Sequence, residues 1–135
     1  MSAVLAQIGL VALGGAIGAV ARFGVTGVVA GSLVGPDDVP RFPWGVLAVN
    51  LVGCFFIGVI AAACIERPAD DRLRMLLIAG FLGSFTTFSA FGLDTLELLK
   101  ADAAGLALAN IAGSVVGGTA LAAAGWAITQ RIIES

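Results

Sequence analysis

Four long stretches of apolar residues, separated by short polar links, dominate the chain. They cover residues 3–34, 43–65, 73–99 and 103–133. Each is long enough to cross the hydrocarbon core of a bilayer as a helix, which takes roughly 20 residues. The first stretch lacks a preceding basic region and is too long for the core of a signal peptide, so we expect it to be retained. The pattern predicts a single transmembrane domain over residues 1–135, an all-α integral membrane protein with four transmembrane helices.

The links between these stretches are short and rich in proline and charged residues. They cover residues 35–41, 66–72 and 100–102. Such links are typical of interfacial loops, and none is long enough to form a domain outside the membrane. We therefore expect both termini on one side of the membrane and a function that takes place within it.

Composition agrees with a membrane protein and excludes several functional classes. Apolar residues make up 59% of the chain and charged residues 12%, against about 45–50% and about 25% in soluble domains. A soluble enzyme and a disordered tail are excluded, and the net charge of −2 also argues against nucleic-acid binding. The chain has no histidine and no recognisable catalytic set, so we expect no enzymatic activity. Cys54 and Cys64 would lie about 15 Å apart on one helix, too far for a disulfide.

The positive charges that flank the spans are nearly balanced between the two sides. On the side of the termini lie Arg67, Arg72, Arg74 and Arg131, and near the other side lie Arg22, Arg41 and Lys100. The positive-inside rule needs an asymmetry, so two interpretations stay open. A weak bias would give one orientation, whereas insertion in both orientations would allow an antiparallel pair. No long internal repeat is visible, so inverted symmetry would require two copies of the chain.

The third stretch contains a block of weak helix formers at its centre. Residues 80–92 combine glycines, serines, threonines and four phenylalanines, and the stretch has its midpoint at Thr86. Broken backbone at that depth is tolerated only where protein, an ion or a water-filled cavity satisfies it. Broken helices with hydroxyl side chains are a recurring kind of ion site. The alternative is a continuous helix whose hydroxyls bond back to the preceding turn.

Phenylalanines recur through this block at Phe81, Phe85, Phe88 and Phe91. Such a stripe usually faces lipid or packs in a core. The edge of a phenyl ring is positive, however, so ring edges can hold a small anion without a full charge that would trap it. The sequence leaves both interpretations open.

Isolated polar side chains occur in the other spans. Asn50 lies about a third of the way along the second stretch, and its amide can donate two hydrogen bonds. Asn110 and Ser114 share one face of the fourth stretch. All three either bond between helices or contact an anion. Arg22 either extends to the interface or attracts anions at a pore mouth.

Carboxylates and small residues receive simpler interpretations. We expect Asp94 and Glu97, near the end of the third stretch, to be solvated at the interface. Small residues at every fourth position let helices approach closely; these are Gly14 and Gly18, then Gly105, Ala109, Gly113 and Gly117. Residues 14–18 are superficially like a nucleotide-binding loop, but they do not follow a strand, so packing is the better interpretation.

Three motifs resemble the CrcB/Fluc family of fluoride channels. The sequence GGAIGAVAR at residues 14–22 resembles the GGxxGAxxR signature, and NLVG at residues 50–53, with Gly58, resembles the NxxG element. GFLGSFTTFSAF at residues 80–91 is similar to the very specific GfxGgxTTFSTF stretch. The resemblance covers essentially the whole chain. Its departures are Ser84 for a glycine, Ala90 for a hydroxyl residue, and Leu106 and Asn110 where some relatives carry Tyr and Ser.

The resemblance implies an antiparallel, dual-topology homodimer whose third helix is broken near the midplane. It implies two fluoride pathways and a central structural sodium ion held by the backbone carbonyls of Gly83 and Thr86. The pathway residues would be Asn50, Thr87, Phe88, Phe91, Asn110 and Ser114, with Arg22 as a charge at the pore mouth. The expected function is passive export of cytoplasmic fluoride across the cell inner (plasma) membrane, which lowers fluoride toxicity. A heterodimer with a paralogue stays open.

Two other classes of function compete with a fluoride channel. A small four-helix, dual-topology, proton-coupled drug or cation exporter needs a titratable carboxylate deep in the membrane. No Asp or Glu lies in the first or second span before Glu66, and Asp94 lies well off the centre of the third. A non-transporting scaffold would not need a polar, broken helix at the midplane.

Overall fold

The computed structural model describes residues 2–29, 41–66 and 71–135, and these form helices joined by short connections. Two of the helices are π-helices, labelled η. The elements are α1 (Ser2–Val29), α2 (Trp44–Glu66), α3 (Asp71–Arg74), η1 (Met75–Leu82), α4 (Gly83–Phe85), α5 (Phe88–Lys100), α6 (Ala104–Ala112), η2 (Gly113–Gly117) and α7 (Gly118–Glu134).

Four helical stretches are long and apolar enough to cross a membrane. They are Val4–Val29, Trp44–Cys64, Asp71–Lys100 and Ala104–Glu134. The predicted all-helical class with four spans is therefore confirmed, and the protein is a multi-pass membrane protein. The third span contains α3, η1, α4 and α5, and the fourth contains α6, η2 and α7. Residues 30–34 of the first predicted stretch, and 35–40 and 67–70 of the links, lie outside the described residues.

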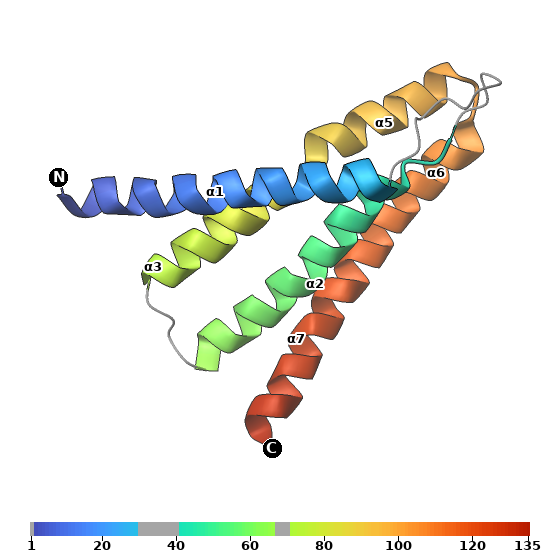
Figure 1. Ribbon diagram of the computed structural model, residues 1–135. Helices are drawn as coiled ribbons and strands as arrows, with labels where there is room; N and C mark the ends of the chain where they lie inside the picture. Colours follow the sequence, from blue (N-terminus) through green and yellow to red (C-terminus); the bar gives the residue numbers. More distant parts are fainter. Residues whose placement is uncertain (1, 30–40, 67–70) are drawn as a thin grey trace.

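The spans pack in two pairs (Figure 1). Helix α1 lies along η1 and α4, and α2 lies along α7. In each pair the two helices run in the same direction, because they are first and third or second and fourth spans. Helix α5 diverges from the first half of its span and packs on α6, and both termini lie away from the corner that joins α5 to α6 (Figure 1).

Glycines bring the backbones of each pair into contact. A Cβ atom on Gly80 would lie 2.9 Å from the carbonyl oxygen of Val11 across the α1–η1 contact. In the other pair, a Cβ on Gly58 would collide with the carbonyl oxygen of Ala122. The spacing of small residues identified the α1 glycines, but it gave no packing role to Gly58, which entered only with a family motif. It also overestimated Gly105, which has no neighbouring atom within 4 Å where a Cβ would sit.

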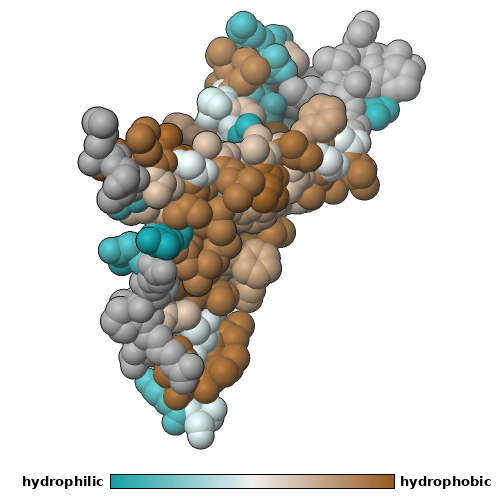
Figure 2. Space-filling view, turned by 60° about the vertical axis from the view of Figure 1, so that its left-hand side comes forward, coloured by the Kyte–Doolittle hydropathy of each residue, from teal (hydrophilic) through white to brown (hydrophobic). Residues whose placement is uncertain are grey.

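Large apolar side chains cover much of the molecular surface. Examples are Leu5, Val20, Val28 and Ile132, each more than 60% exposed. In the face shown in Figure 2, brown hydrophobic side chains occupy most of the middle, and teal hydrophilic ones lie around the periphery, at the top, the left edge and the bottom. This distribution suits a protein whose sides contact lipid, because only its ends need to be polar.

Close packing at Gly58 gives a test of this arrangement. We expect Gly58→Ala to destabilise the folded protein by about 1–3 kcal/mol, because the new methyl group must displace backbone rather than a mobile side chain. Gly9→Ala is the matched control, since a Cβ on Gly9 meets nothing within 4 Å and alanine favours the helix. Thermal unfolding in detergent measures both. Equal stability of the two variants would contradict the close α2–α7 contact.

Candidate functional site

The helical backbone of the third span is interrupted at two threonines. Helix α4 ends at Phe85, and Thr86 (φ −80°, ψ 156°) and Thr87 (φ −150°, ψ 117°) are extended before α5 begins at Phe88. Thr86 closes the first half, because its amide and hydroxyl both donate to the carbonyl of Leu82, at 3.0 and 2.9 Å. Thr87 caps the second half, because its Oγ1 accepts from the amide of Ala90 at 3.2 Å.

Asn50 on α2 holds the interruption from the side. Its Nδ2 donates to the carbonyl of Thr87 at 3.0 Å, and its Oδ1 accepts from the amide of Thr87 at 2.8 Å. One side-chain amide thus replaces both hydrogen bonds that Thr87 would make in a helix or strand. An amide nitrogen carries two hydrogens, so Nδ2 retains a second hydrogen for another acceptor.

Two side-chain hydrogen bonds take the place of helical ones and so release carbonyl groups of the third span. In a continuous helix, the amide of Thr87 would donate to Gly83 and the amide of Ala90 would donate to Thr86. Here these amides donate to Asn50 and to the Thr87 side chain instead. The carbonyls of Gly83 and Thr86 are therefore free of their helix donors. Gly83 is exposed, and with Thr86 it lines a groove that also includes Gly53 and Cys54.

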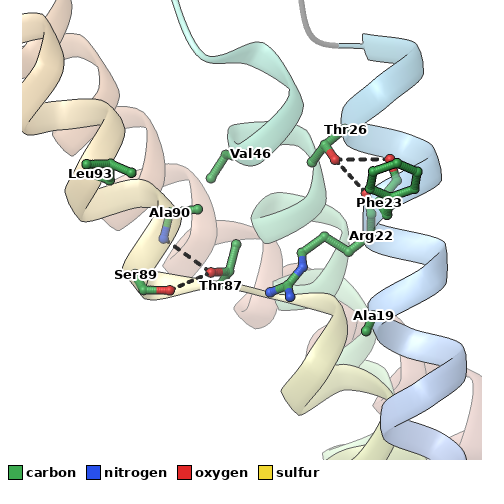
Figure 3. A pocket seen from close by; sticks show the side chains of 9 residues that line it. All are labelled: Ala19, Arg22, Phe23, Thr26, Val46, Thr87, Ser89, Ala90 and Leu93. Atoms are coloured by element: carbon green, nitrogen blue, oxygen red, sulfur yellow. Dashed lines mark hydrogen bonds between the residues drawn. The ribbon is translucent and has the colours of Figure 1, made fainter.

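A cavity of about 540 Å³ lies beside the interruption. Its lining residues are Ala19, Arg22, Phe23, Thr26, Val46, Thr87, Ser89, Ala90 and Leu93. Arg22 extends from α1 towards the interruption (Figure 3), and its guanidinium donates to the carbonyl of Thr86 at 3.4 Å. Arg22 is the charged residue of this lining, and the hydroxyls of Thr87 and Ser89 lie 3.2 Å apart within it.

The stripe of phenylalanines splits into two pairs at the interruption. Phe81 and Phe85 stack with ring centroids 5.6 Å apart, and Phe85 is buried. Phe88 and Phe91 lie on α5 with centroids 5.3 Å apart and ring planes tilted by 43°. Phe88 is 83% exposed. The first pair therefore packs inside the chain, and the second pair includes a ring that is open to an ion, lipid or a second subunit.

The fourth span contributes Asn110 and Ser114, which the sequence placed on one face. Asn110 is 1% exposed, and its Nδ2 donates to the hydroxyl of Thr95 on α5 at 2.9 Å. The hydroxyl oxygen of Ser114 is buried and has no hydrogen-bond partner among the described residues. No described hydrogen bond connects either residue with Asn50 or Thr87, so neither residue takes part in the hydrogen bonds of the interruption itself.

Asp94 differs from the sequence-based expectation. We expected it to be solvated, like Glu97, but it is 8% exposed, and Oδ2 has no partner within the described part of the chain. The expectation for Asp94 was wrong because α5 turns this position inward, whereas Glu97 is exposed. A position near the end of an apolar span does not by itself reveal which way the helix faces.

Metal ligands of the usual side-chain kinds do not converge in the part of the chain that the structure describes. Within residues 2–29, 41–66 and 71–135, no three His, Cys, Asp or Glu side chains cluster. A cation site would therefore depend on backbone oxygens. The carbonyls of Gly83 and Thr86 have the right chemistry, since a neutral oxygen set suits a monovalent hard cation better than a transition metal.

Comparisons with known proteins identify the family of this chain. The family model described as CrcB-like protein, Camphor Resistance (CrcB), matches residues 9–126. A protein of Rhizobium etli named fluoride-specific ion channel FluC is 50% identical over 124 residues, which are 91% of this chain and 95% of the relative. The proteins of the same name from Agrobacterium fabrum and Paracoccus denitrificans are 43% and 44% identical, over 93% and 90% of this chain and 98% and 93% of their own length. The chain therefore belongs to the CrcB-like family.

Proposed function

We propose that this protein is a fluoride-selective channel for passive export of cytoplasmic fluoride. The observation that carries the proposal is the Asn50-held interruption of the third span, placed between the Arg22 cavity and the Phe88–Phe91 pair. The relatives named as fluoride-specific ion channels support it over the proton-coupled exporter. A set of hydrogen-bond donors without a catalytic group suits a channel better than an enzyme.

Fluoride is small and strongly hydrated, so a pore must replace its water with donors and still release it quickly. In this proposal, Arg22 raises the local concentration of anions in the cavity. Asn50 and Thr87 then offer an amide hydrogen and a hydroxyl. The ring edges of Phe88 and Phe91 continue the path with weak positive potential and no fixed charge.

Ser114 of the fourth span extends the proposed pathway. Ser114 has a buried hydroxyl without a described protein partner, which makes it available to an ion in transit. Asn110 lies one turn earlier on the same span, but its amide is bonded to Thr95, so we place it beside the pathway and not on it. Fluoride that enters a cell as the neutral acid ionises inside, and a passive pathway lets the anion leave and lowers its toxicity.

The proposed assembly is an antiparallel, dual-topology homodimer in the plasma membrane, with a heterodimer as the variant if a paralogue exists. Its two-fold axis would lie in the membrane plane, so that two interruptions near the midplane meet. The carbonyls of Gly83 and Thr86 from both subunits would then face one another, and four carbonyl dipoles repel unless a cation lies between them. A structural sodium ion fits the exposed Gly83, whose carbonyl has lost its helix donor, and a second lone pair of the Thr86 carbonyl, which also accepts from Arg22.

Flux through the purified protein tests the proposed function directly. Liposomes that contain the protein should release fluoride without an imposed proton gradient, and chloride should pass far more slowly, because chloride gains less from replacing water with these donors. Ion-selective electrodes measure both. Fluoride release that needs a proton gradient, or chloride release at a similar rate, would point to a carrier or an unselective pore.

The phenyl edges are tested by replacement with a side chain of similar bulk. We expect Phe88→Ile and Phe91→Ile each to lower fluoride flux by about fivefold or more, because an edge contact of the order of 1 kcal/mol is lost. Phe56→Ile is the control, since Phe56 is a half-exposed ring on α2 outside the proposed pathway. Dimer content is followed by size-exclusion chromatography. Wild-type flux in both Phe88→Ile and Phe91→Ile would show that these phenylalanines serve in packing and not in the ion pathway.

Accessibility of the C-terminus tests the antiparallel assembly. A tag placed there should react with an impermeant reagent on both faces of the cell membrane in comparable amounts, because the flanking charges give little preference. An N-terminal tag on the same chain serves as the internal control and should show the same division. A C-terminus on one face in every copy would rule out the antiparallel dimer and, with it, the shared cation site.

A further inference from the structure

A short chain of hydrogen bonds links the fourth span to the turn of α5 that carries Phe91. The amide of Asn110 donates to Thr95 Oγ1 at 2.9 Å, and this hydroxyl donates to the carbonyl of Phe91 at 2.7 Å. Thr95 is 9% exposed and Asn110 1% exposed. The Asn110 amide, the Thr95 hydroxyl and the Phe91 carbonyl therefore form a buried chain of hydrogen bonds. Loss of one of these bonds is costly there, because water does not replace it.

Helix α5 has few other attachments. It packs mainly on α6, with a small contact to α2, and Figure 1 shows it diverging from the first half of its span. Its beginning is held by Asn50 through Thr87. Its end is held by the tight corner to α6, where Asp102 has a φ of 55°. Between these points, the Asn110–Thr95 bond is the side-chain hydrogen bond that ties α5 to α6 among the described residues.

We propose that Thr95 and Asn110 act as a pair of positioning residues that fix the turn of α5 bearing Phe91, and thereby the Phe88–Phe91 pair. The inference rests on the proposed fluoride pathway, in which that pair lines the route of the ion. Asn110 acts in this role through Thr95 and Phe91, because its burial and its bond to Thr95 keep it engaged with the protein.

The geometry explains why both residues are needed. The hydroxyl of Thr95 has one hydrogen, which it donates to Phe91, so its oxygen lone pairs remain to accept from Asn110. A threonine that bonds back to the preceding turn bends its helix slightly. Asn110 on α6 fixes the position of Thr95 Oγ1, which donates to the carbonyl of Phe91. The bend of α5 is thereby coupled to the position of the fourth span.

A pathway built on ring edges is sensitive to such positioning. The edge of a ring attracts an anion only when it faces the ion, and the attraction is lost if the ring turns its negative face. Loosening the turn that carries Phe91 would therefore lower flux while every pathway side chain remains present.

The experiment compares Thr95→Val, which keeps the shape but removes the hydroxyl, with Thr95→Ser, which keeps the hydroxyl. We expect Thr95→Val to lower fluoride flux by about tenfold, as displacement of a positioned group does elsewhere, and Thr95→Ser to retain most of it. Thr119→Val is the matched control, because the hydroxyl of Thr119 also bonds back, to Val115, but is exposed and has no partner on another helix. Wild-type flux in Thr95→Val would overturn the proposal.

A spectroscopic readout separates positioning from ion binding. With 4-fluorophenylalanine in place of Phe91, the ¹⁹F NMR signal in fluoride-free buffer should shift or broaden in Thr95→Val and in Asn110→Leu, and should stay unchanged in Thr119→Val. Asn110→Leu also covers the case in which Thr95→Val does not fold, because it breaks only the bond between the helices. An unchanged signal in both pair variants would overturn the proposal.

The double variant Thr95→Val/Asn110→Leu completes the test. If the two residues act as one unit, it should lose no more flux than the more impaired single variant. Two outcomes would overturn the proposal, because each would indicate that Asn110 acts on the ion directly. One is a double variant whose loss of flux is the product of the two single losses, and the other is a loss in Asn110→Leu with wild-type flux in Thr95→Val. Wild-type protein without fluoride flux would contradict the proposed channel function, while the ¹⁹F signals would still decide whether the pair positions Phe91.

Discussion

A helix interrupted inside an apolar span must find partners for the backbone groups that it releases, because lipid supplies none. Asn50 meets this need for Thr87 with one side chain, since its amide both donates and accepts. The side chains of the two threonines satisfy the adjoining helix ends. The amide groups of Thr86 and Thr87 are therefore bonded although the helix is interrupted, while the carbonyls of Gly83 and Thr86 have lost their helix donors.

The packing of the spans determines what lies around this interruption. Glycine contacts hold α1 against η1 and α2 against α7, which leaves α5 attached mainly to α6. Arg22 of the first span reaches the carbonyl of Thr86, and a cavity lined by residues of α1, α2 and α5 lies beside this contact. The first half of the third span is closely packed on α1, and its second half, α5, is attached mainly to α6. The polar groups of the interruption lie where these two halves meet.

Selectivity in such a site follows from the kind of donors that it presents. Amide and hydroxyl hydrogens replace the water of a small anion, and phenyl edges add a weak attraction. A fixed cation in the narrowest part would bind the ion too firmly for rapid passage, and Arg22 lies in the cavity beside the interruption rather than among the phenyl rings. In our proposal, the buried Thr95–Asn110 bond also positions those rings.

The sequence by itself determined the features that depend on length and local composition. Four apolar stretches of sufficient length predict four spans, because the thickness of the bilayer fixes what a helix must cover. The poor helix propensity around Thr86 and Thr87 and the polar side chain of Asn50 were also visible, and so was the motif that resembles a known family. None of these signals depends on which helix packs against which.

Only the tertiary structure decided how the polar residues are used. Asn50 and Thr87 are 37 positions apart, and no periodicity shows that one completes the backbone of the other. Burial of Asp94, the division of the phenylalanines into a packed and an open pair, and the contact at Gly58 likewise depend on the facing of helices distant in sequence. In a chain that is apolar all round, the pattern of hydrophobicity does not distinguish a face that meets lipid from one that meets another helix, so only packing settles it.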